Sequence, residues 1–351
     1  MNSIKTPAKL ILSGEHAVVY GAPALAMSVN RFTNVKIEEY KSNKIFVDFK
    51  TLNFSLEFSV TDLVTFKKNI DEKYQDFSEN KINIREVFSK PHFLALYTIA
   101  SFFRMLNCDP KYGSKITIDS DIPIGRGLGS SAALIIGLLK AISEFHAVEI
   151  SEKDFFNVAR NIENLQHGQS SGLDLYLAMH GGAVLFNDGK FSPRPLPKIP
   201  FYLVDTGLPK NTTGECVLAV KKYFVQDAPK NTVFKNAVDG VYNKGGGWGL
   251  LNDFSGITLA LDASITKNDL TGTRNCIREN HKLLKYIGVV PEKVANFISE
   301  IETRNFSGKI CGAGAITGEN GGIVLVIGDE NINDLIVKYQ YKIINNERVK
   351  E

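Results

Sequence analysis

The sequence has few cysteines and no long apolar run, and both absences narrow its class. Its four cysteines stand far apart without a C-x-x-C pair, at Cys108, Cys216, Cys276 and Cys311. A disulfide framework or a zinc site is therefore not expected, and reduced thiols fit a cytosolic protein. The apolar run at 10–12 is too short for a signal-peptide core, and that at 132–139 is too short to span a bilayer. We expect a soluble, cytoplasmic protein.

A strong charge of one sign is also missing. Lysine and arginine number 41 against 38 acidic residues, so the net charge is +3. This small excess gives no reason to expect nucleic acid or a membrane surface as the main partner. With 351 residues, of which 44% are hydrophobic, the chain is long enough for one very large domain or two ordinary ones.

Two common nucleotide-binding motifs are absent as well. No stretch fits the P-loop pattern G-x-x-x-x-G-K-[ST]. The dinucleotide fingerprint G-x-G-x-x-G fails because Ser130 stands where the third glycine should be. The preceding residues 115–120 alternate polar and apolar side chains, whereas the central parallel strand of a dinucleotide-binding fold is apolar throughout.

The chain contains a different glycine loop, Asp121-Ile-Pro-Ile-Gly-Arg-Gly-Leu-Gly-Ser-Ser, followed by an apolar helical pattern through residue 142. Glycines let backbone N–H groups approach a ligand closely. A helix that begins at Ser130 or Ser131 adds free N–H groups and the positive end of its dipole. The loop therefore predicts a phosphate-binding site. The competing interpretation is a plain glycine turn before a core helix.

Residues 7–20 place ionisable side chains within apolar sequence. A short strand carries Lys9, and a turn presents Glu15 and His16. Three such side chains are costly to bury unpaired, so they predict a polar pocket. A surface turn is the alternative.

A second stretch with ionisable side chains comprises the end of the predicted helix that starts at Ser151 and the loop after that helix. Glu163 lies off the centre of the apolar stripe of this helix, and Asp174 lies in the small-residue loop after it. A carboxylate in that loop can accept a proton from a substrate hydroxyl, or it can cap a helix over 175–179. The residues alone favour the cap.

The remaining pattern predicts a mixed α and β chain. Antiparallel strands are expected within 31–60, a helix-and-loop excursion over 62–92 and a core helix over 92–106. A proline-rich linker at 192–200 is expected to separate a first domain, 1–190, from a second, 200–351. In the second domain, strands are expected at 201–205 and 322–327, and helices near 214–226, 255–265, 272–287 and 291–304. The glycine run at 245–249 has no purpose that we can derive.

Several stretches, taken in order, resemble the motifs of the GHMP kinases. They are Pro7-Ala-Lys-Leu-Ile-Leu-Ser-Gly-Glu-His-Ala-Val-Val-Tyr-Gly21, Pro123-Ile-Gly-Arg-Gly-Leu-Gly-Ser-Ser-Ala-Ala133, the helix and loop from Glu163 to Asp174, and the partial motif Cys311-Gly-Ala-Gly314. The resemblance implies an α+β, two-domain GHMP kinase fold. Its N-terminal domain would be like domain 2 of ribosomal protein S5, and its C-terminal domain would be ferredoxin-like.

The resemblance also implies an activity, the ATP- and Mg²⁺-dependent phosphorylation of a small-molecule alcohol by a homodimer. Asp174 would orient or deprotonate the acceptor hydroxyl, with Lys9 beside it. Mg²⁺ would be held by Glu163 and by Ser131 or Ser130. The ATP-binding residues would be Gly125, Arg126, Gly127, Leu128, Gly129, Ser130 and Ser131; the acceptor-binding residues would be Glu15, His16, Asp174 and Thr213 or its neighbour Thr212.

The run Gly-Glu-His-Ala-Val-Val-Tyr-Gly favours mevalonate, at its 5-hydroxyl, as the acceptor. Phosphomevalonate, a sugar or an amino-acid alcohol remain alternatives, as does a non-catalytic ligand sensor. Three positions depart from the family pattern. The third motif continues as Gly312-Ala-Gly-Ala-Ile-Thr instead of a glycine run, Arg126 replaces a small residue, and Ser170 replaces a proline.

Overall fold

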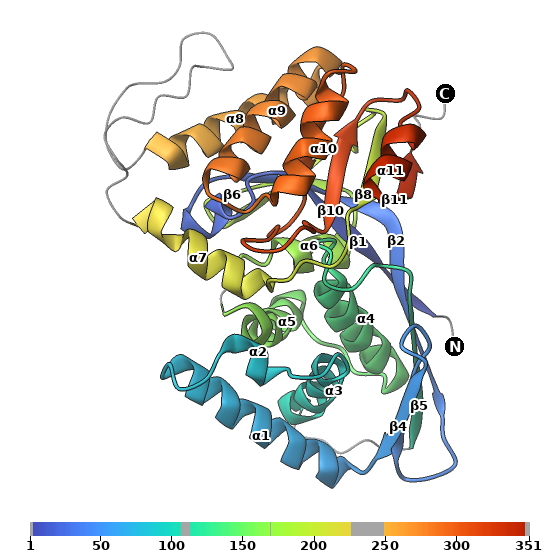
Figure 1. Cartoon of the computed structure of the whole chain (residues 1–351). Helices are drawn as coiled ribbons and strands as arrows, with labels where there is room; N and C mark the ends of the chain where they lie inside the picture. Colours follow the sequence, from blue (N-terminus) through green and yellow to red (C-terminus); the bar gives the residue numbers. More distant parts are fainter. Residues whose placement is uncertain (1–2, 107–112, 169, 226–248, 348–351) are drawn as a thin grey trace. The chain divides into compact units, whose positions relative to one another are not determined.

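The computed structural model describes residues 3–106, 113–168, 170–225 and 249–347 (Figure 1). Cys108 and residues 245–248 of the glycine run lie outside the described residues. Strands and helices are mixed, as expected for an α+β chain. The elements are β1 (Ile4–Ser13), η1 (Ala17–Tyr20), β2 (Ala24–Glu39), β3 (Ile45–Phe49), β4 (Phe54–Phe58), α1 (Val60–Ser78), α2 (Ile84–Val87), α3 (Phe93–Leu106), β5 (Ser114–Ser120), α4 (Ser130–Phe145), α5 (Glu152–His167), α6 (Leu173–His180), β6 (Ala183–Asn187), β7 (Lys190–Arg194), β8 (Phe201–Asp205), α7 (Thr213–Val225), α8 (Gly249–Thr266), α9 (Leu270–Tyr286), α10 (Glu292–Glu302), β9 (Ser307–Ile310), β10 (Ile323–Ile327), α11 (Asn333–Tyr339) and β11 (Lys342–Glu347).

The chain divides into two compact units. The first comprises Met1–Lys9, Ser28–Ile124 and Gly129–Gly181, and the second comprises Leu10–Met27, Gly125–Leu128 and Gly182–Glu351. The chain therefore passes from one unit to the other several times, once within the glycine loop. The domain bounds 1–190 and 200–351 stay a prediction.

In the first unit, a sheet is covered by helices. β3 pairs in parallel with β5 and antiparallel with β4, and Thr33–Glu39 of β2 pair antiparallel with β5. Buried and partly exposed residues alternate along β5, which is why its sequence alternates. The inward side chains of these strands pack against α1 to α6. The predicted helix at 92–106 is confirmed as α3, and the excursion at 62–92 contains α1 and α2.

One buried hydroxyl joins three elements of this unit. Thr6 Oγ1 in β1 lies 2.8 Å from the carbonyl oxygen of Ala133 in α4 and 3.1 Å from that of Thr33 in β2. A hydroxyl has a single proton to donate, and a buried one is costly without an acceptor. Thr6 therefore fixes the start of β1, and with it Lys9, against the first turns of α4.

The second unit contains a four-stranded antiparallel sheet in the order β11-β8-β10-β9. Its core is formed with α8, α9 and α10, as predicted from the helical patterns in this part of the chain. β6 pairs with β7 and with Ala24–Met27 of β2. β7 includes residues 192–194, so the linker predicted at 192–200 overlaps the end of this strand, and only residues 195–200 lie between β7 and β8.

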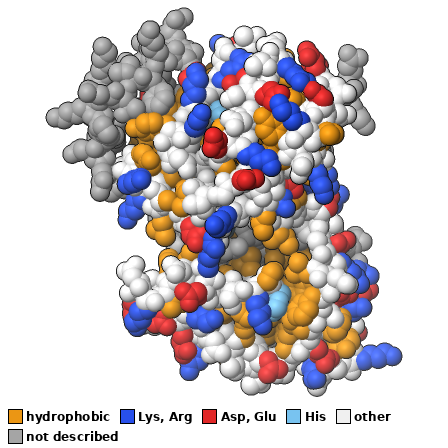
Figure 2. Space-filling model, viewed as in Figure 1, with side chains coloured by type: hydrophobic (Ala, Val, Ile, Leu, Met, Phe, Trp, Pro, Cys, Tyr) orange, Lys and Arg blue, Asp and Glu red, His pale blue; other side chains and the backbone are white. Residues whose placement is uncertain are grey.

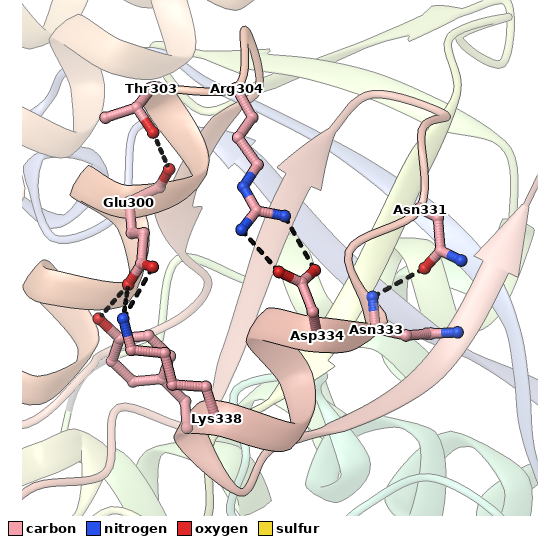
Figure 3. A network of polar contacts seen from close by, with 8 residues as sticks. Glu300, Thr303, Arg304, Asn331, Asn333, Asp334 and Lys338 are labelled. Carbon is pink, nitrogen blue, oxygen red and sulfur yellow. Dashed lines mark hydrogen bonds and ion pairs between the residues drawn. The ribbon is translucent and has the colours of Figure 1, made fainter.

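The surface of the second unit carries an ion-pair network between α10 and α11. Arg304 binds Asp334 with two hydrogen bonds of 2.8 and 2.6 Å, and Lys338 binds Glu300 at 2.7 Å (Figure 3). These side chains are mostly exposed, so the pairs contribute little to stability. Charged side chains of both signs are spread over the face seen in Figure 2. Within the part of the chain that the structure describes, no helix has both the length and the apolarity needed to cross a membrane.

Candidate active site

Lys9 and Asp174 meet beside the end of the glycine loop in the first unit. Lys9 lies in β1 and is 5% exposed, and its Nζ is 2.8 Å from Oδ2 of Asp174. Asp174 lies in the first turn of α6, where Gly172 is the N-cap and no side chain caps the helix. The capping interpretation of Asp174 is therefore wrong. The side chain of Asp174 remains 26% exposed, so its carboxylate can still reach a ligand.

Gly129 lies against this ion pair and is also the N-cap of α4. A Cβ atom at this position would be 2.9 Å from Cγ of Lys9 and 3.4 Å from Oδ2 of Asp174, and the φ angle of Gly129 is +70°. Only glycine fits both constraints without strain. The predicted start of the helix at Ser130 is confirmed, and Ser130 and Ser131 form its first turn, partly buried. The free N–H groups of α4 thus begin next to Lys9 and Asp174.

Glu163 and His167 face the same ion pair from α5. Glu163 is 2% exposed, and Ser170 Oγ donates a hydrogen bond to its Oε2. Burial and the neighbouring Asp174 carboxylate raise the pKa of Glu163 above its usual range. Burial lowers the pKa of His167 to about 4, against the opposing effect of Asp174, so this ring is neutral. Ser170, which departs from the family pattern, is a partner of Glu163.

The first half of the glycine loop, Gly125–Leu128, is part of the second unit and packs within it. Leu128 is buried, and a Cβ atom on Gly127 would overlap the carbonyl oxygen of Cys311. The backbone of Gly127 also approaches Gly312 so closely that a Cβ atom there would be 2.7 Å from Cα of Gly127. The loop and the Cys311-Gly-Ala-Gly motif are therefore in contact through main-chain atoms.

The turn after β1 holds Glu15 and His16 in a strained and buried conformation. His16 has φ 61° and ψ −52°, and Ala17 N donates to the carbonyl oxygen of Glu15 at 2.6 Å. This geometry is a γ-turn with a positive φ angle, which is rare for a residue other than glycine. Such strain persists only where the surrounding structure imposes it, and it clusters at functional sites.

His16 is neutral, and one of its ring nitrogens is available. Burial lowers the pKa of His16 to about 4, and Lys309 adds to this effect. Nε2 lies 3.1 Å from the carbonyl oxygen of Ala313, so we assign the proton to Nε2. Nδ1 is then an acceptor, and it is buried without a hydrogen-bond partner among the described residues.

Glu15 is fully buried with Lys309, a residue that the sequence analysis did not single out. The two side chains form an ion pair and are 1% and 0% exposed. Lys309 also donates to the carbonyl oxygen of Ile11 at 3.1 Å. Nearby, Asn280 Nδ2 donates to Ser13 Oγ at 2.6 Å. The turn is thus anchored by α9 and β9 of the second unit.

The altered third motif forms a fixed turn. Asn211 Oδ1 accepts hydrogen bonds from Ile316 N and Thr317 N at 3.1 and 2.9 Å, and a third from Thr317 Oγ1 at 3.0 Å. Thr212 instead caps α7 by accepting from Glu215 N, and Thr213 is exposed at the first position of that helix. Among the residues predicted for the site, Thr213 is the one whose proposed role is least supported by its surroundings.

Three comparisons with known proteins agree on one family. Residues 94–182 match the family model described as GHMP kinases N terminal domain. A mevalonate kinase of Methanocaldococcus jannaschii is 27% identical over 353 residues, which covers 99% of this chain and 97% of that protein. A mevalonate kinase of Pyrococcus horikoshii is 29% identical and covers 88% of this chain and 84% of its own. The crystal structure of the Methanococcus jannaschii mevalonate kinase matches with a TM-score of 0.73 at 24% identity, over 98% of each chain.

Proposed function

We propose that this chain, which belongs to the GHMP kinase family, transfers the γ-phosphate of ATP to the 5-hydroxyl of mevalonate. The observation that carries the proposal is the Lys9–Asp174 ion pair next to Gly129 at the start of α4. It provides a base, a cation and a phosphate-binding helix terminus in one place. Phosphoryl transfer depends mainly on such positioning and electrostatics.

Each residue of the proposed site has a role that its chemistry supports. Asp174 orients the acceptor hydroxyl and takes its proton, and Lys9, paired with Asp174 at 2.8 Å, offsets negative charge that develops on the phosphoryl group. The N–H groups of residues 125–131 bind the ATP phosphates. Nδ1 of His16 accepts a hydrogen bond from a hydroxyl of the acceptor, and Glu15 and Thr213 complete the proposed acceptor site.

The residues present fit a Mg²⁺ ion. Within the described residues, no three carboxylate, histidine or cysteine side chains gather into a metal-binding group. Mg²⁺ does not need such a cage, because it is usually held by one or two carboxylates together with substrate phosphates and water. Glu163 is a carboxylate whose charged form is disfavoured first by burial and then by Asp174, so a cation there relieves an existing cost. Glu163 and the Ser131 hydroxyl would hold Mg²⁺, which neutralises phosphate charge when bound.

Glu163→Gln is expected to raise the Mg²⁺ concentration needed for tight ADP binding by about tenfold or more, since each 1.4 kcal/mol lost is tenfold in affinity. Glutamine keeps the shape of Glu163 and its acceptor for Ser170, and it avoids burying a charge, so the thermal midpoint should not fall. Calorimetry of ADP binding across a Mg²⁺ series measures the effect. Glu152→Gln, on the same helix with a side chain that is 74% exposed, is the matched control. An unchanged Mg²⁺ dependence would remove Glu163 from the metal site.

ADP release from MgATP with a panel of acceptors tests the proposed reaction. We expect turnover with mevalonate, background rates with 5-phosphomevalonate, galactose and homoserine, and loss of turnover when the metal is chelated. Turnover with another acceptor in place of mevalonate would retain the kinase and reject the substrate. No turnover with any of them, despite ADP binding, would favour a non-catalytic ligand sensor.

The family resemblance supports four further parts of this proposal. They are the Mg²⁺ requirement, a homodimer, a cytoplasmic location and the domain bounds 1–190 and 200–351.

A further inference from the structure

Arg126 is a charged side chain inside a loop that is otherwise built for backbone contacts with phosphate. It stands between Gly125 and Gly127, whose φ angles are +69° and +88°. Glycine-rich segments lose more conformational entropy than others when they are fixed in one shape. An arginine at this position can act in two ways, either as a phosphate ligand or as an anchor for the loop.

The guanidinium of Arg126 is occupied by Asp205. The two side chains form an ion pair, and they are 23% and 15% exposed. Asp205 is the last residue of β8, and its Oδ1 also accepts a hydrogen bond from Gly207 N at 2.9 Å. The carboxylate is therefore held by two donors, the Arg126 guanidinium and the Gly207 N–H group, and it neutralises the arginine charge where the loop begins.

The main chain of Arg126 is held by the same sheet. Ile323 N, at the start of β10, donates to the carbonyl oxygen of Arg126 at 3.0 Å. A Cβ atom on Gly322 would lie 2.8 Å from that oxygen, so the backbones are in close contact. β8 and β10 pair with each other, with Asp205 opposite Ile323. The side chain and the main chain of Arg126 thus attach to paired residues of two neighbouring strands.

We propose that Arg126 is a positioning residue, whose ion pair with Asp205 fixes residues 125–128 in the shape that binds nucleotide phosphates. This inference rests on the proposed function, because it assumes that the glycine loop binds a nucleotide. Pre-organisation of this kind raises affinity by removing the cost of ordering the loop on binding. The side chain of Arg126 makes no phosphate contact in this arrangement, since its charge is used by Asp205.

Calorimetry of ADP binding distinguishes the two possible roles of Arg126, an anchor for the loop and a direct ligand of phosphate. We expect Arg126→Met and Asp205→Asn each to weaken ADP binding by about tenfold. This factor corresponds to about 1.4 kcal/mol, which is within the range of coupling energies between residues in contact. The double variant should bind no more weakly than the weaker single variant. Asp205→Asn keeps an acceptor for Gly207 N, so the turn after β8 is preserved.

Each other outcome overturns the proposal. If Arg126 binds phosphate directly, Arg126→Met weakens ADP binding, whereas Asp205→Asn leaves it unchanged or strengthens it by releasing the guanidinium. If the pair is only structural, both variants lower the thermal midpoint without changing ADP affinity. Arg304→Met and Asp334→Asn are matched controls, because they disrupt an exposed arginine–aspartate pair of the same unit (Figure 3). These should not alter ADP binding.

The readout separates this inference from the proposed reaction. ADP binding requires neither mevalonate nor turnover, so a failed acceptor panel leaves the test intact. Turnover of mevalonate with unchanged ADP affinity in both variants would reject the anchor and keep the kinase. Wild-type protein that binds no ADP would overturn both proposals.

Discussion

Asp174→Asn is expected to lower kcat by about 10³-fold or more, since a positioned acid or base contributes roughly 10² to 10⁴ and the charge of Asp174 also balances Lys9. Asparagine has the same shape and can still accept a hydrogen bond from Lys9 Nζ, but it cannot take the proton of the acceptor hydroxyl. Steady-state kinetics with MgATP and mevalonate measure the loss.

Folding and ADP binding of this variant should change little. The buried ammonium of Lys9 loses one carboxylate, yet Glu163 is close enough for the charges of Asp174 and Lys9 to shift its pKa. Without Asp174, one of the two causes that raise the pKa of Glu163 is removed, so a negative charge on Glu163 beside Lys9 becomes less costly. Asp262→Asn is the matched control, because Asp262 pairs with Arg194 at 2.9 Å in the second unit. A kcat of Asp174→Asn near that of Asp262→Asn would reject Asp174 as the base.

Lys309→Met is expected to lower the free energy of unfolding by about 3–5 kcal/mol, the usual cost of removing one partner of a buried ion pair. The cost arises because Glu15, which is 1% exposed, would keep a negative charge without its cation. The carbonyl oxygen of Ile11 would lose a donor as well. Urea unfolding followed by circular dichroism measures the change.

A double variant shows whether the pair itself is the cause. Lys309→Met with Glu15→Gln removes both charges, so it should recover a substantial part of the lost stability, as when buried ion pairs are replaced together. Lys338→Met, at the exposed pair with Glu300 in Figure 3, should have little effect. A loss in Lys309→Met no larger than in Lys338→Met would contradict the buried pair.

Local patterns in the sequence predicted local structure well. The glycine loop followed by apolar helical spacing predicted α4 and its start, and the resemblance to the GHMP kinases is confirmed. The capping interpretation of Asp174 was wrong because Gly172, one of several small residues there, is the N-cap and starts α6 two residues earlier than expected. Such loops offer too many equivalent cap positions for the sequence to choose among them.

The family resemblance placed Lys9 beside Asp174, and the two side chains do form an ion pair, but two other pairs of distant residues were not predicted. Lys309 and Glu15 are 294 positions apart, and Arg126 and Asp205 are 79 apart. Glu15 and Arg126 were candidates for the site, but their partners Lys309 and Asp205 looked like ordinary charged residues, because a single sequence records only what is local. The available signal was position, since Lys309 stands two residues before Cys311 of the Cys311-Gly-Ala-Gly motif and Asp205 ends an apolar strand.

The backbone contact between Gly127 and Gly312 has a consequence for how this sequence can change over evolution. A Cβ atom at position 312 would lie 2.7 Å from Cα of Gly127, and one at position 127 would overlap the carbonyl oxygen of Cys311, so neither glycine can gain a side chain unless the backbone moves. The two motifs therefore evolve as one element, although 185 positions separate these glycines (312 − 127). Because the atoms that a new side chain would meet belong to the main chain, no side-chain substitution in the other motif would make room for it, and random mutagenesis followed by selection for activity should leave both glycines untouched.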